Sequence, residues 1–445
     1  MRVTLVYPSM GGRVRAAQMQ PLSIAALAAL APGDITVRFF DDRVEAVDYD
    51  APAELAAISV QTFTAKRAYE IAAEFRRRKV PVVLGGFHVT AVPDEAAEHA
   101  DAVVVGQAEE SWPRLLADAR AGRMQRVYRQ ERRPSLEGLH YRRDIFRGKR
   151  YLPINMVEFG RGCPYACGFC SVSEYFGRRK DCRPVREVVD EIRRLPRHIV
   201  EFVDDNLIGD VACAKELLRA LIPLKIRWVA QAGIEFAFDD ELLELAAASG
   251  CAGLLLGLES LNEQSLREMG KSGRCRADQF ADAIARLHAH GIRICASFLF
   301  GYDHDTPAAF ADTLTFANRQ RFMLALFNHL TPFPGTRLYA EMEAQGRLRF
   351  DRWWLASGVR WGDVVFEPKQ FSAGALADAC RRNRRNFYRP ANILRRAMLP
   401  ANRRRLAESL ALNFLVRKDV LEKQGFPLGQ KEISCRSNLD ASRAC

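Results

Sequence analysis

The first 125 residues alternate short apolar runs with segments whose apolar positions repeat at helical spacing. The runs predict strands, and the segments between them predict helices such as 22–30 and 65–78. Strands that alternate with helices usually pair in parallel, so this pattern predicts an α/β fold with an open, doubly wound, Rossmann-like sheet. The predicted strands are residues 3–7, 36–40, 55–60, 80–84 and 102–105.

A second alternating series begins at residue 154, with helical patterns at 185–195, 241–248 and 277–290. Six strand–helix units are fewer than the eight of a complete TIM barrel, so this series predicts an incomplete (β/α)6 barrel. Its predicted strands are residues 154–159, 199–203, 226–230, 253–258, 294–300 and 325–330. The expected organisation is a sheet domain at 1–125, a polar linker at 126–150, the partial barrel at 151–340 and a helical, basic C-terminal region at 341–445.

Composition agrees with this globular organisation. The chain has 445 residues, of which 48% are hydrophobic and 27% charged, and this length is enough for about three domains. The apolar stretch 22–31 is shorter than the ~20 residues that a bilayer span needs, and the first residues lack the features of a signal peptide. We therefore expect no transmembrane segment and a cytoplasmic location.

The net charge of +12 is concentrated near the end of the chain. Ten arginines and no acidic residue lie between 379 and 405. Such a stretch suits phosphates, an anionic membrane surface or an acidic substrate, but a solvated helical face explains it as well and is the interpretation we favour. No nucleic-acid partner is expected.

A short loop carries the strongest chemical pattern of the sequence, Gly162-Cys163-Pro-Tyr-Ala-Cys167-Gly-Phe-Cys170. Three thiolates leave a tetrahedral zinc ion one ligand short, and no second CxxC pair completes the set. They suit a four-iron cluster in which one iron takes an external ligand. Cys182 could instead supply a fourth ligand, so a structural zinc or a fully ligated cluster stays open.

This CxxxCxxC loop, including Phe169 before its last cysteine, resembles the loop of radical S-adenosylmethionine (SAM) enzymes. The sheet followed by a partial barrel resembles the cobalamin-binding subgroup of that superfamily over nearly the whole chain. The resemblance implies a 4Fe-4S cluster held by Cys163, Cys167 and Cys170, with SAM chelating the fourth iron. It also implies reductive cleavage of SAM to a 5′-deoxyadenosyl radical that abstracts hydrogen from the substrate. The electron would come from a donor such as flavodoxin or ferredoxin.

The strand ends of the predicted barrel are interpreted through the same resemblance. Asp204-Asp205-Asn206 would accept hydrogen bonds from the SAM ammonium group, although any one of them could instead cap the next helix. Glu259 would bind the ribose hydroxyls, with helix capping as its alternative. Ser297 begins a segment similar to the one that packs along adenine. Gln231 either faces the cavity or is a buried amide satisfied by backbone.

The loops at the carboxyl ends of the first-sheet strands look similar to cobalamin-domain loops. They contain Gly85, Gly86 and Gly106, which permit a close backbone approach to a large ligand. The Asp-x-His-x-x-Gly motif that often supplies histidine to cobalt is absent from the sequence. We therefore expect cobalamin without a protein histidine ligand, with loss of the cofactor as the alternative. His88 is expected to contact the corrin edge or neighbouring backbone.

These observations predict a cobalamin-dependent radical SAM methyltransferase that acts on an unactivated carbon in a specialised biosynthetic pathway. The alternatives are a radical rearrangement, cyclisation or oxidation, or a noncatalytic iron–sulfur or cobalamin-binding module. The substrate is expected to be a small molecule, either lipid-like or anionic. We expect the pocket to be lined by Trp353, Trp354 and Trp361, unless these tryptophans pack in a core instead. For Cys435 and Cys445, the sequence leaves open metal binding, a reactive thiol, or neither role.

Overall fold

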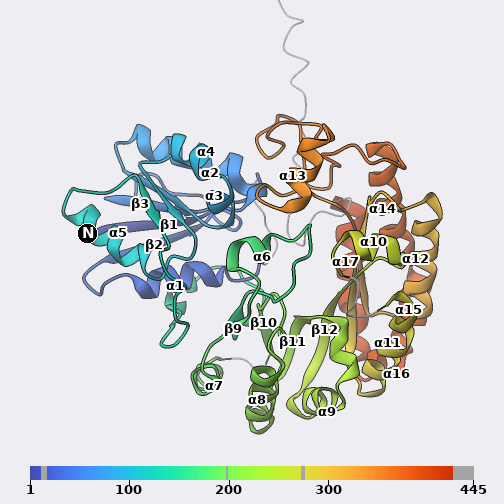
Figure 1. Ribbon diagram of the computed structural model, residues 1–445. Coiled ribbons are helices and arrows are strands. Elements are labelled where there is room, and N and C mark those ends of the chain that lie inside the picture. The colour runs from blue at the N-terminus through green and yellow to red at the C-terminus, as the bar shows by residue number, and fades with distance from the viewer. Residues whose placement is uncertain (12–17, 197–198, 272–275, 424–445) are drawn as a thin grey trace, which may run out of the picture.

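Six parallel strands form the first sheet of the computed structural model, which describes residues 1–11, 18–196, 199–271 and 276–423 (Figure 1). Their order is β2-β1-β3-β4-β5-β6, so the winding direction reverses between β1 and β3, as in doubly wound folds. The strands are β1 Arg2–Tyr7, β2 Thr36–Asp41, β3 Leu55–Ser59, β4 Val82–Gly85, β5 Ala102–Val105 and β6 Val127–Arg129.

Strand β6 corrects the expected linker. The polar segment predicted to begin at residue 126 starts with this sixth strand, in which Val127 pairs with Val103 of β5. The strand is only three residues long, and just Tyr128 of the three is buried. A pattern this short does not show the period of two that reveals longer strands.

Side chains of the first sheet alternate between two hydrophobic cores. Leu55 and Ala57 of β3 pack on the side of α1 and α5, whereas Ala56 and Ile58 pack on the side of α2, α3 and α4. This alternation follows from the period of two along a strand and leaves the strand ends free for ligands. The helices are α1 Leu22–Leu30, α2 Ala65–Arg77, α3 Phe87–Ala91, α4 Pro93–Glu98 and α5 Ser111–Arg120.

The second sheet is the expected partial barrel. Its six strands are parallel in the order β14-β13-β12-β11-β10-β7, and β7 and β14 are its two edges. The strands are β7 Asn155–Val157, β10 Ile199–Phe202, β11 Arg227–Ala232, β12 Cys251–Glu259, β13 Arg293–Phe300 and β14 Leu324–His329. A separate antiparallel ribbon consists of β8 Gly160–Arg161 and β9 Asp181–Cys182.

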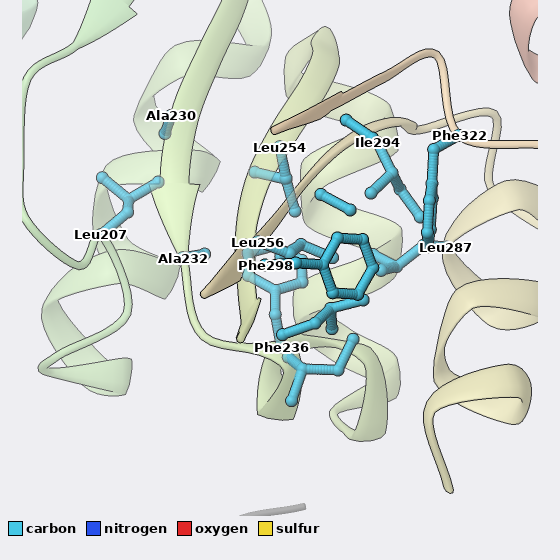
Figure 2. Packing of buried hydrophobic residues seen from close by; sticks show 14 of the residues in the cluster. Leu207, Ala230, Ala232, Phe236, Leu254, Leu256, Leu287, Ile294, Phe298 and Phe322 are labelled. Carbon is cyan, nitrogen blue, oxygen red and sulfur yellow. The ribbon is translucent and has the colours of Figure 1, made fainter. Parts of the chain in front are cut away.

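Helices cover the outer face of this barrel and build the largest core of the molecule. Figure 2 shows Leu254, Leu256 and Phe298 from the strands packed against Leu287 and Phe322. Full burial of one such side chain stabilises the fold by about 2 kcal/mol. The helices around the barrel are α6 Ser171–Phe176, α7 Val185–Arg193, α8 Val211–Leu221, α9 Asp240–Ser249, α10 Glu263–Glu268, α11 Phe280–Ala289 and α12 Pro307–Arg319.

The C-terminal region is helical, as predicted, and touches both sheets. Helix α14 packs against β14 and α12. Trp353 and Trp354 are buried in a core of the first sheet, so these two tryptophans have a packing role. The helices are α13 Arg337–Ala344, α14 Ala373–Phe387, α15 Pro390–Ala397, α16 Pro400–Arg403 and α17 Leu406–Lys423. Cys435 and Cys445 lie outside the described residues.

None of the helices in the described ranges has the length and hydropathy needed to cross a bilayer.

Candidate active site

The three cysteines lie on the loop between β8 and α6, and backbone contacts fix the course of this loop. The Gly168 N–H donates to the Met269 carbonyl (3.0 Å), and the Gly168 carbonyl accepts from the Leu338 N–H (2.9 Å). Gly162 has a φ of 80°, and a Cβ there would collide with the Arg179 carbonyl oxygen. The glycine before Cys163 is therefore required by both conformation and space.

The thiols of this loop are close enough to affect one another. Burial, together with the neighbouring Cys167 and Cys163, raises the pKa of Cys170 to about 11. The Asn206 amide donates to Cys163 Sγ at 3.8 Å, and its oxygen accepts from the Gly233 N–H at 3.3 Å. Hydrogen bonds to sulfur of this kind are typical of iron–sulfur sites.

The donor set fits a cluster better than a single ion. A zinc site needs its ligands around one centre, whereas a four-iron cluster is bound by cysteines that each hold a different iron. Cys182, the possible fourth ligand, interacts with Cys213 of α8. The loop therefore favours a cluster with three protein ligands.

The three side chains of Asp204-Asp205-Asn206, which were predicted to contact SAM, have different surroundings. Asp204 is buried, where it pairs with Lys180 and accepts a hydrogen bond from the Phe159 N–H at 2.9 Å. Both of its oxygens have partners within the protein, and its contact with the SAM ammonium group stays a prediction. Asp205 accepts from the Gly162 N–H at 3.2 Å, and burial raises its pKa to about 6.

Two of the other predicted SAM residues line one cavity of about 270 Å³ at the barrel mouth. Glu259 and Ser297 share it with Phe169 of the cysteine loop. Glu259 lies at a register shift between β12 and β13, has a φ of 64°, and accepts from Lys271 Nζ at 3.1 Å. Such backbone strain persists only where surrounding structure imposes it and is common at functional sites. The cavity also contacts three aromatic rings, those of Phe63, Phe333 and Trp361.

Gln231 lies on the inner face of the barrel. Its neighbours Ala230 and Ala232 are buried in the outer core, so the alternation along β11 directs Gln231 to the opposite face. Its side chain is exposed there. Gln231 is therefore an exposed side chain on the inner face and not a buried amide, and it is not among the residues that line the barrel-mouth cavity.

The predicted cobalamin glycines line a second, larger cavity of about 430 Å³ at the carboxyl ends of the first-sheet strands. Gly85, Gly86 and Gly106 all contact it. Gly86 has a φ of 107°, and a Cβ there would lie 2.8 Å from the Val60 carbonyl oxygen. Tyr175 of α6 forms part of the cavity wall and donates to the Gly106 carbonyl at 2.9 Å. The cavity therefore lies between the first sheet and the helix that follows the cysteine loop.

His88 does not belong to this cavity. It is fully buried in α3, where Nε2 lies 3.2 Å from Glu95 Oε1 and the ring packs edge-on against Trp354 at 5.4 Å. The ring points toward Trp354 of the C-terminal region, and the expected contact of His88 with the corrin edge or neighbouring backbone stays a prediction. The sequence placed His88 at a strand end but could not show the direction of its ring.

Sequence analysis missed an important residue of the same cavity, Arg161. Its guanidinium pairs with Glu109, which follows β5, and with Glu158 at 2.9 Å, and it donates to the Gln107 oxygen at 3.0 Å. The side chain is 11% exposed. Arg161 thus joins the first sheet to the barrel beside the cysteine loop. Proximity to Gly162 and Cys163 was the only sequence feature that could have indicated it.

A three-cysteine loop between a barrel cavity and a sheet cavity defines a class of enzymes that bring two cofactors to one substrate. Comparison with known families places the chain within that class. The Radical SAM superfamily matches residues 157–317, and the B12 binding domain matches residues 9–116. The chain belongs to the radical SAM superfamily, in the subgroup that carries a cobalamin-binding domain.

Individual relatives agree with this assignment. Bacteriochlorophyllide d C-12(1)-methyltransferase of Chlorobaculum tepidum is 31% identical over 389 residues, which cover 84% of each chain. Hopanoid C-2 methylase of Rhodopseudomonas palustris is 26% identical over 76% of this chain and 66% of its own. The structure of TsrM from Kitasatospora setae with cobalamin and a [4Fe-4S] cluster has the same fold, with a TM-score of 0.65, 20% identity and coverage of 85% and 84%.

The chain is therefore an enzyme whose cofactors are a 4Fe-4S cluster, SAM and cobalamin. This assignment favours an enzyme with cobalamin over the noncatalytic module and the sheet without a cofactor that sequence analysis left open.

Proposed function

We propose that this enzyme methylates an unactivated carbon of a small molecule in a specialised biosynthetic pathway. The cluster and SAM supply a hydrogen-abstracting radical, and cobalamin supplies a methyl group. One observation carries the proposal: the cavity at the barrel mouth contacts Phe169 of the cysteine loop, Ser297 of the barrel and Phe63 of the cobalamin domain. A substrate in this cavity can be approached from both halves of the molecule.

The side chains around the cavities have distinct roles in this proposal. Cys163, Cys167 and Cys170 hold the cluster, and Asn206 donates a hydrogen bond to the Sγ of Cys163. Glu259, Ser297 and Gln231 position SAM from the inner face of the barrel, and Asp205 borders both the cysteine loop and the cobalamin cavity. Gly85, Gly86 and Gly106 let cobalamin approach the first sheet.

The lining of the barrel-mouth cavity supports a largely apolar substrate with an anionic or hydrogen-bonding group. Aromatic side chains, among them Phe63, Phe333 and Trp361, form much of its wall. Asn328, Asp363 and Arg384 add polar atoms at the same cavity, next to Glu259. Few polar groups on an apolar wall are typical of sites that orient one end of a hydrophobic ligand. The relatives named above act on bacteriochlorophyllide d and a hopanoid.

An anaerobic assay tests this function. The reconstituted enzyme, supplied with SAM, cobalamin, a flavodoxin- or ferredoxin-type reductant and candidate apolar substrates, should release 5′-deoxyadenosine and S-adenosylhomocysteine together. The C163A/C167A/C170A variant should release neither. Release of 5′-deoxyadenosine without S-adenosylhomocysteine would indicate that the enzyme catalyses a rearrangement, cyclisation or oxidation and not methyl transfer. Wild-type yields no higher than those of the triple variant would overturn the proposal.

A further inference from the structure

One arginine of the C-terminal region reaches the barrel-mouth cavity. Sequence analysis favoured a solvated face for the arginines between residues 379 and 405, yet Arg384 of α14 is only 9% exposed and lines this cavity with Ser297 and Asn328 of the barrel. Among the described residues that line the cavity, Arg384 is the only Lys or Arg. The inference drawn from it rests on the proposed function, which makes this cavity the substrate site.

Contacts of α14 with two neighbouring elements fix the position of Arg384. The Tyr388 hydroxyl, four residues later and therefore on the same helix face, accepts from the Ala325 N–H and donates to the Ala325 carbonyl, both at 3.2 Å. Ala325 belongs to β14, the edge strand of the barrel. The Asn383 amide donates to the Phe310 carbonyl of α12 at 2.7 Å. The helix therefore holds Arg384 at the cavity before a ligand arrives, which lowers the cost of binding.

The charges at the cavity suit a ligand with a single negative charge. Burial lowers the pKa of Arg384, because a poorly solvated guanidinium is less stable in its charged form, and an anion beside it would offset this cost. The cavity also contains two carboxylates. Glu259 accepts from Lys271 Nζ at 3.1 Å, and Asp363 accepts from the Arg360 N–H at 2.8 Å. A doubly charged phosphate would face both acids with one guanidinium, whereas a carboxylate brings one charge.

The remaining wall of the cavity accommodates an apolar body. Phe63 of the first domain lies 4.0 Å from Trp361 and 5.5 Å from Phe333, measured between ring centroids, and all three rings line the cavity. These rings come from three separate segments of the chain. A ligand whose charged end lies at Arg384 can therefore place its apolar part against aromatic surface.

We propose that the substrate carries a carboxylate and that Arg384 binds it, so that Arg384 selects the substrate and sets its orientation in the cavity. The planar guanidinium fork matches a carboxylate with two parallel hydrogen bonds. The apolar remainder then lies between the cysteine loop, represented by Phe169, and the cobalamin domain, represented by Phe63.

Two probes of equal shape test this proposal without turnover. Naphthoate and its neutral analogue naphthylmethanol are titrated calorimetrically into the anaerobic enzyme loaded with cluster, cobalamin and SAM. The wild type should bind naphthoate at least about tenfold more tightly than the alcohol. R384Q should lose this preference and keep its affinity for the alcohol. R385Q, which changes the exposed neighbour on the same helix, should retain the preference.

A second set of variants keeps the test decisive. W361L should weaken the binding of both probes by a similar factor, because it shortens the aromatic wall that they share. Iron and cobalamin contents show whether R384Q is folded and loaded. If R384Q loses either, R384K takes its place: lysine keeps the charge without the planar fork, so its preference for naphthoate should fall below that of the wild type.

Four results would overturn the proposal. They are equal affinity of the wild type for the two probes, no binding of naphthoate, an undiminished preference in the Arg384 variants, and tighter binding of naphthyl phosphate than of naphthoate. The last result would replace the carboxylate by a phosphate. These outcomes are separate from those of the turnover assay, because a missing methyl transfer would leave the preference for naphthoate intact, and a missing preference would leave methyl transfer intact.

Discussion

Residues of the same chemical type acquire different properties from their surroundings in this protein. Asp204 and Asp205 are adjacent in the sequence, yet one is paired with Lys180 and the other borders the cysteine loop. Glu201 shows the effect most clearly. It alternates with the core residues Val200 and Phe202 on β10 and therefore lies on the inner face of the barrel, where burial alone raises its pKa to about 7.

Glu201 should make stability depend on pH. Between its ordinary pKa of 4.5 and about 7, the folded state keeps a proton that the unfolded state has released. The free energy of unfolding therefore falls as pH rises through this window, by at most about 3 kcal/mol. Glu201→Gln removes the titration. Anaerobic urea unfolding at pH 5 and pH 8 should show a smaller loss for the variant, and parallel losses in both proteins would contradict this account.

At the scale of elements, the cysteine loop depends on the small β8–β9 ribbon. Gly160 of β8 pairs with Cys182 of β9, and the ribbon brings Lys180 against Asp204 at the end of β10. The side chains of this ion pair are almost completely buried. Breaking a buried pair from one side leaves an uncompensated charge, whereas replacing both partners by apolar residues can be neutral. The ribbon and the strand are therefore coupled through one contact.

Lys180→Met should lower the free energy of unfolding by about 3–5 kcal/mol, because the Asp204 carboxylate loses its countercharge. The double variant K180M/D204L should recover most of this loss. Arg179→Met is the matched control, since Arg179 is 71% exposed and its contact with Asp181 should contribute less than about 1 kcal/mol. Urea unfolding and iron content provide the readouts. Equal destabilisation by K180M and R179M would show that the buried pair has no special role.

At the scale of the whole molecule, two of the contacts between the cobalamin domain and the rest differ in their position relative to the cobalamin cavity. Arg161 links Glu109 to the barrel beside the cysteine loop. On the other side, Trp354 Nε1 donates to Glu95 of α4 at 3.0 Å. The first contact lies at the cobalamin cavity, and the second does not. Loss of the first should therefore affect cofactor binding as well as stability.

Arg161→Met should weaken cobalamin binding by about tenfold or more, because Glu109 and Glu158 lose their shared countercharge in the cavity wall. Absorbance titration of the anaerobic, cluster-loaded protein measures this affinity. Arg114→Met, which removes a half-exposed arginine paired with Glu131 at the surface of the same domain, should bind cobalamin like the wild type. An affinity of R161M within twofold of the wild type would contradict the role of Arg161.

The strands of both sheets could be predicted because the apolar runs that mark them depend only on neighbouring residues in the sequence. All eleven predicted strands occur with small changes at their ends, and helix 22–30 coincides with α1. The cysteine loop was identified from its spacing alone. Strand β6 was missed because three residues carry too little periodicity. Candidate residues at strand ends were placed near the cavities, but Asp204 and His88 have partners inside the protein.

The sequence by itself determined the order of strands and helices, the three-cysteine loop and the glycines that permit close approach, since these depend on neighbours along the chain. Tertiary structure alone decided that Asp204 pairs with Lys180, that His88 turns toward Trp354, and that Arg161 joins the two halves. The physical reason is that a side chain's orientation and charge state depend on segments far away in the chain, whose positions no local pattern contains.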